Sequence, residues 1–162
     1  MLLFLLMLFL FLFPILNGFN NLLIPTMIGA PDMAFPKLNA AAFWLVPVFA
    51  VVLMGSFFAP GGPASSGWWS YPPMSLQNPL GHFINGEFLW ILAVALSGIS
   101  SIMGAVNFVT TIIRMRAPGM GFFKMPIFVW TAWAAQTIQL VGLPALTGGA
   151  VMLLFDLSFG TT

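Results

Sequence analysis

Four long apolar runs, with almost no charge between their ends, dominate this sequence. They cover residues 1–24, 38–59, 87–113 and 126–155. A helix needs ~20 apolar residues to cross about 30 Å of hydrocarbon, and each run provides them. The chain has only four Lys and Arg and three Asp and Glu residues in 162, which is too few to cover a soluble domain. The sequence therefore predicts an all-α, polytopic membrane helical bundle with four transmembrane helices.

A short polar hinge, IPTMIGAPDMAFPKLN at residues 24–39, separates the first two runs. Proline lacks an N–H and clashes with the preceding turn, so the prolines and the glycine of this segment should stop a helix from passing straight through: Pro25, Gly29, Pro31 and Pro36. Asp32 has few neighbours that could neutralise it, so we expect it to face water or a wet cavity. The simpler alternative is that Asp32 caps the next helix or is a solvated loop acid.

The positive charges predict which side of the membrane each loop occupies. Lys37 lies in the first loop, and Arg114, Arg116 and Lys124 lie in the third. The second loop and the tail after residue 155 carry no Lys or Arg. The positive-inside rule places the first and third loops on the cytoplasmic or matrix side. Glu87 and Asp156 then fall on the opposite side.

Composition also excludes several classes of function. The net charge of +1 leaves no basic patch, so nucleic acid is not an expected partner. The absence of cysteine excludes disulfides, thiolate metal sites and cysteine nucleophiles. His82 is the single histidine and cannot form a metal site alone.

Polar side chains inside the apolar runs indicate helix faces that meet protein. In the third run, small and polar residues recur every three or four positions: Ala93, Ser97, Ser100, Gly104, Asn107 and Thr111. Such a face permits close helix approach and hydrogen bonds between helices. Gln136 and Gln139 lie about one turn apart in the fourth run, so one side of that helix should also face protein. Trp68 and Tyr71 in the second loop suit an interfacial aromatic belt.

Several long strings of the chain resemble subunit I of the haem-copper cytochrome oxidases. They are NNLLIPTMIGAPDMAFPKLNAAAFW (20–44), GWWSYPP (67–73), SGISSIMGAVNFVTTIIRMRAPGM (97–120) and MPIFVW (125–130), in the family's order and nearly its spacing. The resemblance implies that the four runs correspond to the second to fifth helices of a twelve-helix subunit. Residues 1–162 would then be a partial transmembrane domain of that subunit.

The resemblance also implies roles for individual residues. Asp32 of the APDMAFP motif corresponds to the acid that opens the family's D-pathway, which takes up protons from the inner side. The family's water-ordering groups along that pathway correspond to Asn21, Asn39, Ser100, Ser101 and Asn107. Amides both donate and accept without titrating, so they position water and carry no charge. Trp68 and Tyr71 match an outer-loop motif near the haem propionates, although packing and interfacial anchoring are the ordinary roles of all these residue types.

The sequence departs from the family at the metal sites. With Met7 and Pro14 aligned, the family's low-spin haem histidine falls at Leu3, which cannot bind iron. The copper-binding histidines and the high-spin haem ligand belong to later helices of the family. We therefore expect haem and copper in the complete subunit and none ligated by this chain.

The leading hypothesis is a part of the catalytic subunit of a proton-pumping cytochrome c oxidase, supplying the entrance of the proton-uptake pathway. The implied partners are the remaining helices of subunit I, other oxidase subunits, cytochrome c and lipid. The implied location is a bacterial inner membrane, or a thylakoid or mitochondrial inner membrane. The alternative is a non-catalytic truncated or split relative with a packing or assembly role, which Leu3 favours. The sequence does not decide between cytochrome c and quinol as electron donor.

Overall fold

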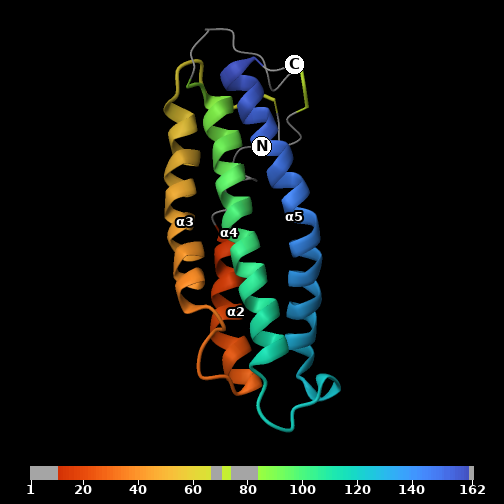
Figure 1. The fold of residues 1–162 in the computed structure, drawn as a ribbon. Helices are drawn as coiled ribbons and strands as arrows, with labels where there is room; N and C mark the ends of the chain where they lie inside the picture. Colours follow the sequence, from red (N-terminus) through yellow and green to blue (C-terminus); the bar gives the residue numbers. More distant parts are fainter. Residues whose placement is uncertain (1–10, 67–70, 74–83, 161–162) are drawn as a thin grey trace.

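A computed structural model describes residues 11–66, 71–73 and 84–160, which form an antiparallel helical bundle (Figure 1). Its long helices are α2 (Phe13–Ile28), α3 (Pro36–Gly55), α4 (Gly86–Arg114) and α5 (Ile127–Phe159). Two short 3-10 helices follow α3 and precede α5: η2 (Ser56–Phe58) and η4 (Phe122–Lys124). The all-α class and the four-helix bundle are confirmed for these residues.

Three of the described helices are long and apolar enough to cross a membrane. They are Pro36–Phe58, Gly86–Arg114 and Ile127–Phe159, with mean hydropathies of 2.2, 2.0 and 1.8. The first predicted span includes residues 1–10, which lie outside the described residues. The chain is thus a multi-pass integral membrane protein.

The hinge does stop the first helix, as the sequence predicted, but at Gly29 and not at the end of the first apolar run, so Pro25 lies inside the helix. α2 contains Pro25 and continues to Ile28, four residues beyond the predicted run. The hydroxyl of Thr26 donates to the carbonyl oxygens of Leu22 and Leu23 at 3.0 and 2.9 Å. Proline is more frequent in membrane helices than in soluble ones, so its presence inside α2 fits a membrane span. The helix stops at Gly29, where φ is 73° and only glycine is unstrained.

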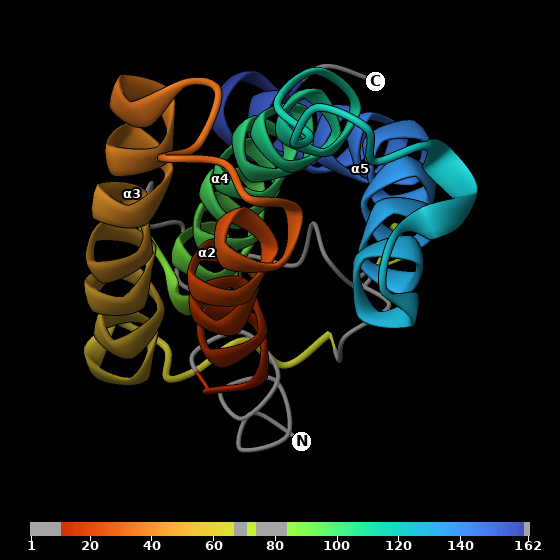
Figure 2. The ribbon, with the colours of Figure 1, turned by 90° about the horizontal axis from the view of Figure 1, so that it is seen from below.

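The central helix of the bundle is α4, which packs between α3 and α5 (Figures 1 and 2). In its most apolar window 44% of the residues are buried, against 22% in α3 and 11% in α5. The small and polar stripe predicted for this helix does face protein, since all six of its residues are buried or half-buried. Two apolar clusters lie along α4: Phe49, Leu53, Trp90, Ile91, Ala93, Ala95 and Ala150 near its start, and Ile24, Ile28, Met33, Phe108, Ile112, Met125, Val129 and Ala132 near its end.

The loops that carry positive charge lie at one end of the bundle. The end of α2, the start of α3, the end of α4 and η4 all meet there (Figure 1). The backbone joins the two loops directly, because the Ala117 N–H donates to the Ile28 carbonyl oxygen at 2.9 Å. Glu87, in the first turn of α4, and Asp156, near the end of α5, lie at the opposite end. This arrangement is the one that the charge pattern predicted for the loops.

Candidate functional site

Two side chains of α4 hold the hinge between α2 and α3. The Ala34 N–H donates to Thr111 Oγ1 and the Phe35 N–H donates to Asn107 Oδ1, both at 2.9 Å. Thr111 and Asn107 are completely buried, one turn apart on α4. The Thr111 hydroxyl in turn donates to the Asn107 main-chain oxygen at 2.7 Å. We call these two residues the hinge clamp, because they satisfy backbone donors just before and at the start of α3 that would otherwise lack partners.

Asp32 lies on the exposed side of this hinge. Its Oδ1 accepts a hydrogen bond from the Met33 N–H at 2.7 Å, and the Met33 side chain turns into the core. The N-cap of α3 is Phe35, and no side chain caps that helix. The alternative in which Asp32 caps α3 is therefore wrong. Its carboxylate faces solvent at the end of the bundle where the basic residues gather.

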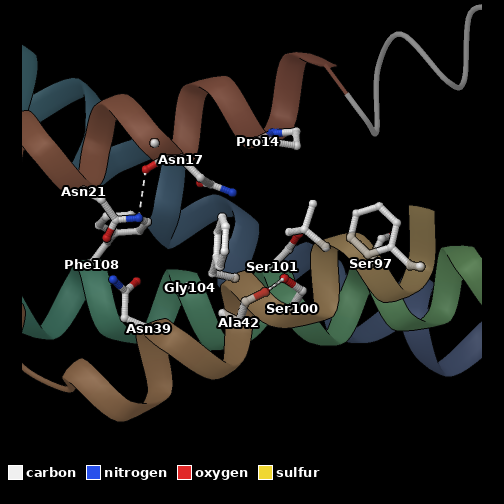
Figure 3. A pocket seen from close by; sticks show the side chains of 14 residues that line it. Pro14, Asn17, Asn21, Asn39, Ala42, Ser97, Ser100, Ser101, Gly104 and Phe108 are labelled. Carbon is white, nitrogen blue, oxygen red and sulfur yellow. Dashed lines mark hydrogen bonds between the residues drawn. The ribbon is translucent and has the colours of Figure 1, made fainter. Parts of the chain in front are cut away.

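A cavity of about 130 Å³, with polar side chains in a mainly apolar wall, lies between α2, α3 and α4 (Figure 3). Four of the residues that the resemblance singled out line it: Asn21 from α2, Asn39 from α3, and Ser100 and Ser101 from α4. At about 30 Å³ per water molecule, the cavity has room for about four waters. Apolar side chains such as Phe43, Phe49 and Phe108 form the rest of its wall.

The polar groups of the wall leave acceptors without protein donors. Asn21 Nδ2 donates to the Asn17 main-chain oxygen at 3.0 Å, but Asn21 Oδ1 is buried and has no partner among the described residues. Ser100 Oγ donates to the Ala42 oxygen at 2.7 Å, and Ser97 Oγ donates to the Val94 oxygen at 2.8 Å. Each hydroxyl oxygen keeps lone pairs for a further donor. A buried acceptor without a donor costs about 1–3 kcal/mol, so water in the cavity would stabilise this arrangement.

The structure does not bring every predicted site residue to the cavity. Asp32 lies outside its wall, and Asn107 uses its Oδ1 to hold Phe35, while Asn107 Nδ2 is buried without a partner among the described residues. Tyr71 is exposed in the second loop. Trp68 lies outside the described residues.

Sequence reasoning missed two polar residues of the wall, Asn17 and Ser97. Ser97 belongs to the predicted stripe of α4 but was interpreted only as a packing residue. Asn17 stands four positions before Asn21, so the helical period already places the two amides on one face. That spacing was the signal that could have found it.

The described residues contain no cluster of potential metal ligands. Within residues 11–66, 71–73 and 84–160 there is no group of three His, Asp, Glu or Cys side chains that could hold a metal ion. The amides and hydroxyls of the cavity wall are not the imidazole, thiolate or thioether ligands that haem iron and copper take. Leu3 and His82 lie outside the described residues. The cavity suits water and not a metal.

The described residues thus form part of a multi-pass membrane bundle with a cavity whose wall carries amides and hydroxyls. The chain belongs to the family described as cytochrome c and quinol oxidase polypeptide I, which it matches over residues 4–162. It is 46% identical over 157 residues to cytochrome c oxidase subunit 1 of Thermostichus vulcanus and 47% identical over 156 residues to that of Synechocystis sp.. A third relative, from Corynebacterium diphtheriae, is 43% identical over 149 residues. These matches cover 96%, 96% and 91% of this chain but 27%, 27% and 26% of the relatives, so the chain spans about a quarter of their length.

Proposed function

We propose that this chain is part of the catalytic subunit of a cytochrome c oxidase and that it supplies the entrance of the proton-uptake pathway. The observation that carries the proposal is the cavity whose wall combines Asn21, Asn39, Ser100 and Ser101 with a buried, unpartnered amide oxygen. The complete oxidase would reduce oxygen to water with electrons from cytochrome c. The described residues would supply only part of that enzyme. Other parts of the complex would provide the ligands of haem and copper, the remaining helices and the other subunits.

In this proposal Asp32 gathers protons at the basic end of the bundle. It is exposed and its Oδ1 accepts from the Met33 N–H, so its carboxylate stands on the hinge in reach of bulk water. Asn39 follows on the first turns of α3 and lies in the wall of the cavity. Protons would pass from Asp32 to the waters beside Asn39, and the neutral amides and hydroxyls would order those waters without trapping a charge. The basic end would then face the inner side of the membrane.

The outer loop has a separate proposed role. The resemblance of Trp68 and Tyr71 to a haem-proximal motif assigns them to the neighbourhood of the haem propionates in the complete subunit. The exposure of Tyr71 leaves its ring free to contact other parts of the subunit.

Replacing Asp32 by asparagine tests the pathway. The amide cannot carry a proton, so in the assembled oxidase reconstituted in vesicles we expect proton uptake from the inner side to slow about tenfold or more, which corresponds to about 1.4 kcal/mol in the barrier. A pH-indicator dye on that side measures the uptake. Asp156→Asn, at the opposite end of the bundle, is the matched control and should leave uptake unchanged.

Two results would contradict the proposed function at different levels. Unchanged turnover and pumping stoichiometry in Asp32→Asn would remove the pathway assignment. A purified assembly with no haem absorbance in its reduced-minus-oxidised spectrum would remove the oxidase assignment. The second result would favour the alternative, a non-catalytic relative with a packing or assembly role.

A further inference from the structure

We propose that Asn17 is an additional water-positioning residue of the cavity, which extends its ordered water from the Asn21 and Asn39 end toward Ser97 and Ser101. The inference rests on the proposed function, because it assigns a role in proton uptake. It concerns a side chain to which neither the sequence motifs nor the family resemblance gave a role.

The position of Asn17 places a free amide in the cavity. Asn17 lies on α2 one turn before Asn21, and its side chain lines the cavity from the α2 side, across from α4 (Figure 3). Its main-chain oxygen accepts the bond from Asn21 Nδ2, which ties the two turns together. The Asn17 amide itself makes no hydrogen bond within the described residues. Both its N–H groups and its oxygen are thus available to water.

The chemistry of the wall gives that amide a specific task. Asn21 commits one N–H of its Nδ2 to the Asn17 main-chain oxygen and keeps the other, while Ser97 and Ser100 have committed their single hydroxyl protons to carbonyl oxygens. The two serine hydroxyls can therefore accept hydrogen bonds from water but cannot donate to it. A chain of ordered waters also needs protein donors, because otherwise every water must direct its protons at the wall. Asn17 Nδ2 supplies such donors farther from the hinge than Asn39, on the side of the cavity opposite Ser101.

The surroundings of Asn17 do not indicate a packing role. Asn17 belongs to neither apolar cluster, and it is half-buried against a cavity with room for about four waters. A leucine has the same branched arrangement of side-chain heavy atoms, although it is larger, and could occupy the same place by packing alone. Hydrogen bonding to water is therefore the property that distinguishes asparagine here.

The test compares three variants in the assembled, reconstituted oxidase. Asn17→Leu should slow proton uptake about fivefold, the effect expected of one lost hydrogen bond. It should also raise the solvent deuterium isotope effect on uptake while haem content and the rate of haem reduction stay unchanged. Asn17→Gln, which keeps the amide, should recover at least half of the rate. Asn20→Leu removes a neighbouring half-buried amide of α2 that does not line the cavity, and it should have no effect.

The outcomes separate this inference from the proposed function. If Asp32→Asn slows uptake and Asn17→Leu does not, Asn17 has no role in ordering water but the pathway stands. Equal slowing in Asn17→Leu and Asn17→Gln would show that shape, and not hydrogen bonding, matters at this site, and would overturn the inference. If Asp32→Asn leaves uptake unchanged while Asn17→Leu slows it, the proposed entrance at Asp32 fails but the role of Asn17 stands. If neither variant slows uptake, both fail.

Discussion

Replacing Gly98 by alanine should force α4 away from α5 and destabilise the assembled protein by about 2–3 kcal/mol. A Cβ atom at position 98 would lie 2.1 Å from Thr147 Oγ1, 3.2 Å from Thr147 Cβ and 3.3 Å from Thr147 Cγ2. Rotation about χ1 can move Thr147 Oγ1 away, but Thr147 Cβ, at 3.2 Å, moves only with the backbone of α5. The helices must therefore separate, and the packing along the buried face of α4 suffers. Thermal unfolding of the complex in detergent, followed by tryptophan fluorescence, measures the loss.

Two further substitutions show whether this one contact causes the effect. Gly148→Ala, next to Thr147 on α5, adds the same methyl group where the described residues leave open space within 4 Å, and it should be nearly neutral. Thr147→Ala removes two of the three crowding atoms, so combining it with Gly98→Ala should restore most of the stability. If the double variant unfolds as early as Gly98→Ala alone, the crossing of α4 and α5 is not limited by this pair.

The apolar runs predicted the existence of the helices well but their ends unevenly. The run 87–113 differs from α4 by one residue at each end, because Asn85 accepts from the Phe88 N–H at 2.8 Å and so fixes the start. The run 126–155 stopped at the first acid, whereas α5 continues to Phe159 and ends before Gly160, where φ is 61°. A single acid does not stop a helix, and Pro25 did not stop one either. The C-terminal ends of α2 and α5 each depend on a glycine in the left-handed conformation, Gly29 and Gly160. A hydropathy profile does not register this property.

The candidate site divides between what local sequence can predict and what only tertiary structure provides. The helical period predicted that Ser97, Ser100, Asn107 and Thr111 share a buried face, and all four are buried. Gln136, expected to face protein, is buried as well. The bond from the Phe35 N–H to Asn107 joins residues 72 positions apart, so no local pattern could indicate it. The same long-range contact explains why Asn107 holds the hinge and does not line the cavity.

Loss of the hinge clamp should release the segment that carries Asp32. Asn107→Leu removes the acceptor of the Phe35 N–H, and Thr111→Val removes that of the Ala34 N–H. Each change leaves a backbone donor in an apolar setting without a partner, at a cost of about 2 kcal/mol, or roughly a 30-fold larger population of the open hinge. The expected result is a hinge that moves on and off α4 while the four helices remain assembled.

A cysteine at Met33 reports this motion. The chain has no cysteine of its own, and Met33 is only 4% exposed, so the thiol of Met33→Cys should react slowly with a maleimide while the hinge is closed. Adding Asn107→Leu or Thr111→Val should speed labelling about 30-fold, because the thiol reacts only from the open state.

The neighbouring Thr110 provides the control for the clamp. Its hydroxyl bonds only to the Val106 carbonyl oxygen of its own helix, so Thr110→Val should leave the labelling rate of Met33→Cys unchanged. If Asn107→Leu, Thr111→Val and Thr110→Val all leave the labelling rate of Met33→Cys equal, the apolar cluster that contains Met33 closes the hinge without the clamp. Asn107 and Thr111 would then be free to vary without moving Asp32, and a loss of proton uptake in either variant would need a cause other than the placement of Asp32. Faster labelling in the two clamp variants alone would instead assign both side chains to the placement of Asp32.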